Sequence, residues 1–219
     1  MHCVVDNCIE EATGYSRFCI AHRRADRRHG SPLQTGVTAA ELQQYRSLVS
    51  ARIKSNEDNP AWGILLRRWE ALLAAVSHEL EVYQSGVPTN RHEVAAWRVI
   101  GAVGMATEPM VVIEVVLAMY TLQEFNPRRF KSDQAFITQL VRRVRSLAPM
   151  SVATYIDHLT KKPKRVYRDC PAGVTRVIGA LLVETFGHAG LVIAKLEQRE
   201  ATKIAEESKL LHSALGDLR

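Results

Sequence analysis

The sequence has 219 residues, of which 47% are hydrophobic, so it can form one substantial core together with a small additional segment. This hydrophobic content excludes a disordered chain, and the low aromatic content of 6% suits helical packing. The formal net charge of +6 is compatible with an anionic partner, although many soluble proteins carry a similar charge.

The start of the chain lacks a basic segment followed by an apolar one, so we expect no secretory signal and a cytoplasmic location. The most apolar run, residues 100–122, is interrupted by Glu108, Pro109 and Glu114. These residues favour a buried pair of helices over a membrane span, and we expect no membrane partner. Sequence motifs of nucleotide-binding loops and common hydrolases are missing, so we expect neither catalytic residues nor a small-molecule substrate.

Three cysteines and a histidine near the start of the chain follow the pattern C-x4-C-x10-C-x2-H. They are Cys3, Cys8, Cys19 and His22. Two close pairs of ligands separated by a loop can meet around one tetrahedral Zn²⁺ ion. Three thiolates and one imidazole complete its coordination shell, so we predict one structural zinc ion per chain.

The alternative is that these four side chains are buried or reactive residues without a metal, because their spacing departs slightly from the commonest zinc knuckle. His2 and Asp6 are nearby substitute ligands. If His22 is not the fourth ligand, His29 is the next candidate, because it also follows Cys19. The remaining cysteine, Cys170, is expected to be a small core or surface residue.

A longer motif surrounds the expected ligands. It comprises Cys3, Cys8, Gly14, Cys19, His22, Arg28, His29, Gly30 and Pro32. On these residues, the stretch 3–33 resembles a zinc-binding segment of phage and mobile-element proteins that is often found beside HNH homing endonucleases; Phe18 replaces the usual glycine before the third cysteine. The later histidines are scattered without the paired arrangement of an HNH core. The resemblance therefore implies a nucleic-acid-binding element and not a nuclease.

Positive charge is concentrated in residues 128–168, which contain eleven lysines and arginines against only Asp133 and Asp157. We therefore divide the chain into a zinc-binding segment, 1–36, and a helical domain, 37–219, with a basic block at 128–168.

Apolar residues recur at helical spacing in every long segment after residue 37, which predicts a mainly α protein, a multi-helix bundle of seven or eight helices with a small N-terminal zinc knuckle. Strand is expected only in the metal segment and near 164–168. The first three helices are expected at residues 38–54, 60–83 and 90–105, and the fourth from 107 to its close at Asn126 and Pro127, each beginning at a cap or a proline.

Within 132–168, Ser132 caps a fifth predicted helix, and a turn at 148–150 leads to a short sixth helix capped by Ser151. Helix, turn and helix form the outline of a helix-turn-helix, although any corner between two helices has the same outline. The basic residues 161–168 that follow are expected to form a loop or wing that contacts phosphates.

A final pair of helices, about 172–187 and 189–215, is predicted on either side of Gly187 and Gly190. The last helix alternates Glu and Lys with Ile204, Leu211 and Leu215. Its end is therefore predicted to be a solvated or dimerising helix.

The zinc segment and the basic block together indicate a non-enzymatic, zinc-containing nucleic-acid-binding protein, accessory or regulatory, of a phage, plasmid or transposon. We expect double-stranded DNA in preference to RNA, most of the affinity in the basic block, and base reading by the sixth helix. The expected contact residues are Arg23, Arg24, Arg27, Arg28, Arg128, Arg129, Lys131, Arg142, Arg143, Arg145, Ser151, Thr154, His158, Lys161, Lys162, Lys164, Arg165, Tyr167 and Arg168.

Two other functions fit the same features. The chain could be a protein-interaction subunit that docks on a recombinase, transposase or nuclease, or, less favoured, a diverged nuclease. A homodimer is compatible with each of them.

Overall fold

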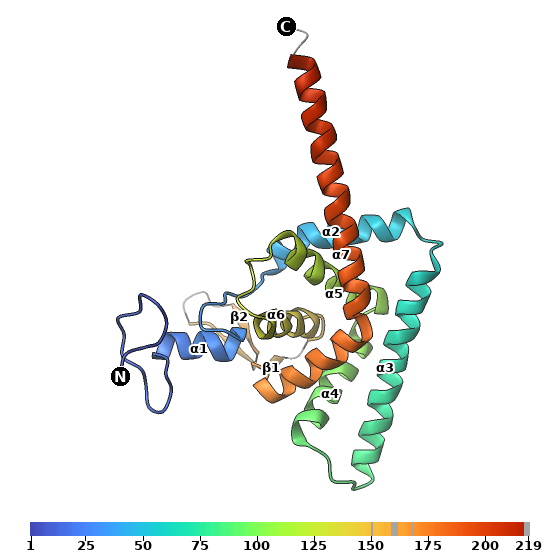
Figure 1. Cartoon of the computed structure of the whole chain (residues 1–219). Coiled ribbons are helices and arrows are strands. Elements are labelled where there is room, and N and C mark those ends of the chain that lie inside the picture. Colours follow the sequence, from blue (N-terminus) through green and yellow to red (C-terminus); the bar gives the residue numbers. More distant parts are fainter. Residues whose placement is uncertain (150, 159–161, 168, 217–219) are drawn as a thin grey trace.

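The computed structural model of the chain describes residues 1–149, 151–158, 162–167 and 169–216, and these residues are mostly helical (Figure 1). The predicted mainly α class is confirmed. In chain order the elements are α1 (Ile20–His29), α2 (Ala39–Ser55), α3 (Pro60–Gln84), α4 (Arg91–Ala106), α5 (Pro109–Phe125), α6 (Asp133–Arg145), β1 (Ser151–Ile156), β2 (Pro163–Tyr167) and α7 (Ala172–Gly216).

Helix α5 is the centre of the bundle. It is apolar on nearly every face, and residues 112, 113 and 115–122 are all buried. Helices α2, α3, α6 and α7 pack around it, as expected for a helix without a polar face. Residues 100–122 therefore belong to two helices, α4 and the buried α5, which meet at 117°.

The helices begin where short-range signals in the sequence predict. Thr38 accepts a hydrogen bond from the backbone of Glu41 in a complete capping box, and Ser132 accepts one from the backbone of Ala135. Asn59 and Asn90 cap α3 and α4 in the same way. Each cap provides an acceptor for a backbone N–H group that has no partner within the helix.

The predicted second helix of the helix-turn-helix is wrong. Ser151 begins strand β1, which pairs antiparallel with β2 so that Thr154 lies opposite Arg165. The physical reason is visible in the sequence, because β-branched residues occupy alternate positions, 152, 154 and 156, which is the period of a strand. A hairpin therefore follows α6, and the predicted strand near 164–168 is confirmed as β2.

The predicted break between two final helices is also wrong, because α7 runs without interruption through Gly187 and Gly190. Both glycines lie against Tyr120 of α5. A Cβ atom at Gly190 would lie 2.3 Å from a carbon of the Tyr120 ring, and one at Gly187 would lie 3.2 Å from its hydroxyl oxygen. These glycines thus allow α7 to approach α5 closely and do not end the helix.

The second half of α7 extends away from the bundle. Figure 1 shows the orange part of α7 against the other helices and the red part projecting beyond them. Residues 198–213 are all exposed. By length and composition, α7 is able to cross a membrane, as is the bent pair α4 and α5, but 39% of the most apolar window of α7 is buried within the protein.

The close contact between α7 and α5 can be tested with two glycine substitutions. Gly190→Ala places a methyl group against the Tyr120 ring and should destabilise the fold by about 1–3 kcal/mol. Gly101→Ala in α4 is the matched control, since a Cβ atom there has no neighbour within 4 Å. It should leave stability unchanged or raise it by up to about 1 kcal/mol. Denaturant unfolding measures both, and equal effects would contradict the assigned packing.

Candidate metal centre

The first half of the metal segment is a compact turn that brings Cys3 and Cys8 together. The backbone of Cys3 donates to Glu10 (3.0 Å), and that of Cys8 donates to Val5 (3.1 Å). Asn7 has a φ of 59°, in the left-handed region that asparagine tolerates better than most residues. The chain therefore reverses between the two cysteines.

The second half presents Cys19 and His22 from the start of α1. Gly14, with a φ of 58°, allows a turn that closes with a hydrogen bond from the backbone of Thr13 to Phe18 (3.1 Å). Cys19 is the N-cap of α1, and His22 follows three residues later. Residues three apart lie on one face of a helix, so both side chains point to the same place.

The four predicted ligands lie in one cluster that can hold a metal ion. Their ligand atoms are all within 4.8 Å of one another. His22 Nδ1 lies 3.4 Å from Cys3 Sγ and 3.3 Å from Cys19 Sγ, while Cys8 Sγ lies 3.9 Å from Cys19 Sγ. Cys3 and Cys19 are buried, and Cys8 and His22 are half-buried.

The thiols of this cluster differ in acidity. Burial raises the pKa of Cys3, but hydrogen bonds from the backbone of Cys19 and Val5 and from the side chain of His22 outweigh it and lower the pKa to about 6. The backbone of Glu10 lowers the pKa of Cys8, but burial and the two neighbouring thiols raise it above its ordinary value. Cys3 is therefore readily available as a thiolate, the form that binds metals.

The alternative ligand His29 has a different partner. Its Nδ1 accepts a hydrogen bond from Nε2 of Gln139 in α6 (3.2 Å). Burial lowers the pKa of His29, and the guanidinium groups of Arg142 and Arg28 lower it further, which favours the neutral ring that this hydrogen bond requires. His29, like His2 and Asp6, is not part of the ligand cluster.

Gln139 connects the metal segment to the bundle. Its side chain is fully buried, and its Oε1 atom also accepts a hydrogen bond from the backbone of Val37 (2.9 Å). Close by, Gly30 ends α1 with a φ of 82°, and a Cβ atom there would lie 2.5 Å from Thr138 Oγ1. Helix α1 is thus fixed against α6 at its C-terminal end.

A charged cluster strengthens the same junction. Asp169 accepts from Arg28 of α1 and from Arg142 of α6, each at 3.2 Å, and Arg142 also donates to the backbone oxygen of Arg28 (3.2 Å). These three side chains are one-third to three-fifths exposed, so the ion pairs orient α1 more than they stabilise it. Sequence analysis missed Gln139 and Asp169; Gln139 is detectable as an amide among the apolar positions of α6.

Four predicted contact residues lie on one face of α1. Arg23, Arg24, Arg27 and Arg28 are exposed. Residues 22, 25, 26 and 29 form the opposite stripe and are half-buried. This division follows the helical period, with the arginines in two adjacent rows of i and i+4 neighbours.

Three arginines of the basic block, Arg129, Arg143 and Arg145, are less available. Arg129 pairs with Glu41 and donates to the backbone oxygen of Gly36 (3.1 Å), so it fixes the linker before α2. Arg143 and Arg145 are half-buried, and within the described part of the chain their Nε atoms are buried without a hydrogen-bond partner. Burial also lowers the pKa of Arg143.

The remaining predicted contacts are divided between exposed positions and the hairpin. Exposed residues are Arg128, Lys131, His158 and Lys162. The backbone of the hairpin strands contains Ser151, Thr154, Lys164, Arg165 and Tyr167. Lys161 and Arg168 lie outside the described residues.

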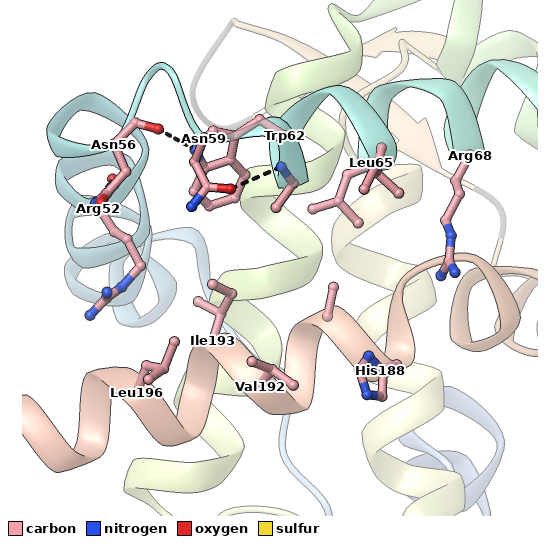
Figure 2. Close-up of a pocket in the computed structure, with 13 residues that line it drawn as sticks. Arg52, Asn56, Asn59, Trp62, Leu65, Arg68, His188, Val192, Ile193 and Leu196 are labelled. Atoms are coloured by element: carbon pink, nitrogen blue, oxygen red, sulfur yellow. Dashed lines mark hydrogen bonds between the residues drawn. The ribbon is translucent and has the colours of Figure 1, made fainter.

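A separate cleft of about 440 Å³ lies between α3 and α7 (Figure 2). Apolar side chains such as Trp62, Leu65 and Val192 line it. The indole N–H of Trp62 donates to the backbone oxygen of Asn56 (2.8 Å), and Arg68 donates to that of Thr185 (3.3 Å). Because its lining is mainly apolar, the cleft is suited to apolar groups.

Compared with protein families, curated proteins and solved structures, the chain has no match. The likeness of residues 3–33 to a phage or mobile-element zinc segment therefore stays an expectation based on its motif.

The metal cluster predicts one bound ion per chain. Cys19→Ser removes a buried thiolate ligand and should abolish metal binding, because His2, Asp6 and His29, the possible substitutes, lie outside the ligand cluster. Metal analysis of the purified protein measures the ratio. Cys170→Ser, which removes the cysteine outside the cluster, is the control and should retain the metal. Equal metal content in both variants would contradict the assigned site.

The hydrogen bonds of Gln139 between the metal segment and the bundle predict an effect on stability. Gln139→Leu keeps a side chain of similar size but leaves the buried N–H group of Val37 without an acceptor, at a cost of about 1–3 kcal/mol. Hydrogen exchange of the α1 backbone should also become faster, because His29 loses its donor. Gln134→Leu on the exposed side of α6 is the control. Unchanged exchange in α1 would show that Gln139 does not hold it.

Proposed function

We propose that the chain is a non-enzymatic zinc protein that binds nucleic acid, with the exposed arginine face of α1 as its main phosphate contact. Double-stranded DNA is the favoured ligand. The resemblance of the N-terminal motif adds the expectation of an accessory or regulatory role in a phage, plasmid or transposon.

The donor set favours zinc among metals. Zn–S and Zn–N bonds of ordinary length in a tetrahedron separate two sulfurs by about 3.8 Å and a sulfur from a nitrogen by about 3.5 Å. The distances of 3.9 Å between Cys8 and Cys19 and 3.3 Å between Cys19 and His22 agree with these values. Three thiolates and an imidazole leave no open position, so zinc would have a structural role here.

The metal segment needs such an ion for its stability. Its own apolar cluster consists of Cys3, Val5 and Cys19, with Cys8 and Phe18 partly buried beside them. A cluster of this size cannot offset the conformational entropy of some thirty ordered residues. Metal binding would supply the missing free energy and hold the first turn of α1 in place.

The arginine face of α1 is the observation that carries the nucleic-acid proposal. Helix α1 has ten residues and is therefore about 15 Å long. None of its residues is buried, so the side that carries the arginines is free. Four guanidinium groups on that side match the repeated phosphates of a nucleic acid, and a helix of this width fits the major groove of DNA. Of these four arginines, only Arg28 has an acidic partner in the described structure, and that partner is Asp169.

The basic block is the weaker candidate for the main contact. Arg129 and Arg142 already bind partners within the fold, and Arg143 and Arg145 are half-buried. Because strand β1 takes the place of the predicted sixth helix, base reading by that helix is no longer part of the proposal. Exposed residues such as Lys162, next to the hairpin, remain available for additional phosphate contacts.

The proposal predicts a loss of affinity when Arg23, Arg24 and Arg27 are all changed to alanine. Each lost phosphate contact should lower the slope of log affinity against log salt by about one, so the slope should fall by up to about three. Fluorescence anisotropy with double-stranded DNA, single-stranded DNA and RNA over a salt series measures both quantities. Arg28 is left unchanged because it also holds Asp169.

Two variants with three substitutions each provide controls. Arg67, Arg91 and Arg199 are exposed arginines outside the proposed surface, and their change to alanine removes the same charge with little expected effect. The change of Arg128, Lys131 and Lys162 to alanine tests the basic block. If only this second variant loses binding, the block is the main contact. If the parent protein binds none of the probes at low salt, the nucleic-acid proposal is wrong and a protein partner becomes the better explanation.

A further inference from the structure

One stripe of α7 continues from the core into the projecting part of the helix. Within the bundle, Phe186, Ala194 and Glu197 lie buried along this stripe. At the same spacing of three and four residues it continues through Ala201, Ile204, Ser208 and Leu211. Beyond the bundle the stripe is exposed, by 65% at Ile204 and 59% at Leu211.

The projecting part, residues 198–213, has no cover in the described structure, since each of its residues is exposed. A helix of about this length is only marginally stable by itself in water, and most helices in proteins are stabilised by packing of one face. Its anchor lies at the base, where Arg52 of α2 pairs with Glu197 and with Glu200, the latter at 2.8 Å. Beyond this anchor, the apolar face of α7 therefore has no packing partner in the described structure.

A groove opens where this face leaves the bundle. It has a volume of about 570 Å³ and lies between α2 and α7. Its apolar lining includes Leu48, Ala51 and Phe125 together with Ala201 and Ile204 of α7. The groove and the exposed stripe share Ala201 and Ile204, so they form one continuous surface.

We propose that this surface pairs with the same surface of a second copy of the chain, with the two α7 helices antiparallel. In this arrangement Leu211 of one copy lies against Ala201 of the other, and Ile204 lies against Ser208. Large residues then face small ones, which lets the helices approach closely. The tip of each helix reaches the groove at the base of the other.

The charges favour the antiparallel direction. The base of the projecting part, residues 198–207, contains three carboxylates and two cations, and one of these carboxylates, Glu200, pairs with Arg52 of α2. The tip, residues 208–216, contains Lys209 and His212 but no carboxylate. Antiparallel pairing places the base, with its small excess of carboxylates, opposite the basic tip, whereas parallel pairing would place the two bases together and the two tips together.

The same composition argues against a lipid surface as the partner. Helices that lie on membranes have lysine and arginine concentrated on their polar face. Here Arg199, Lys203 and Lys209 are balanced by Glu200, Glu206 and Glu207, so the projecting part has no excess of lysine and arginine. The proposed pairing does not depend on nucleic-acid binding.

The full-length protein should be a dimer by light scattering or sedimentation. Leu211→Glu places two charges in the interface and should raise the dissociation constant at least about thirtyfold. Leu210→Glu is the matched control, because Leu210 is 71% exposed on the outer side of the same helix and should leave the dimer intact. Circular dichroism verifies that both variants stay helical. A monomeric parent, or loss of dimer in the Leu210 variant alone, would overturn the proposal.

The direction of pairing can be tested separately with cysteines. Ala201→Cys and Leu211→Cys variants should form a disulfide-linked dimer when mixed, because these positions face each other only in the antiparallel pair. Each variant alone should give no more cross-link than the parent protein. If each variant instead cross-links with itself, and the mixture gives no more cross-link than the separate variants, the pair is parallel and the antiparallel arrangement is refuted.

Discussion

The buried amide of Gln139 is the central contact between the metal segment and the bundle. One end of the amide accepts the backbone N–H of Val37, and the other donates to His29 at the end of α1. A buried amide that lost either partner would incur the cost of an unsatisfied polar group. The amide therefore fixes both ends of the stretch between α1 and α2, and with them the direction of the arginine face.

Much of the fold was predictable because it depends on short-range signals. Caps such as Thr38 and Ser132 identified the helix starts, and the uniformly apolar run of α5 identified the central helix. The cluster of Cys3, Cys8, Cys19 and His22 was also predictable, since metal ligands must occur in close pairs. These features are encoded by neighbours in the sequence.

The errors have a different origin. Glycines at 187 and 190 usually indicate a helix end, but here their lack of a side chain admits Tyr120 of α5, a residue distant in sequence. A serine after a turn predicts a helix from Ser151, but the alternation of β-branched residues at 152, 154 and 156 is the stronger signal, and these residues form β1. The interactions of Arg129 and Arg142 with distant acids likewise required the three-dimensional fold.

The continuity of α7 makes it a rigid spacer with a fixed pitch. Its 45 residues correspond to a path of about 68 Å along the helix, which changes direction within the bundle before it reaches the projection (Figure 1). A helix cannot lengthen without turning, so an insertion of one residue in the projection would move its tip by about 1.5 Å and rotate it by about 100°. Whatever binds the tip is therefore held at a defined angle to the rest of the protein, and the length of α7 is constrained in whole turns.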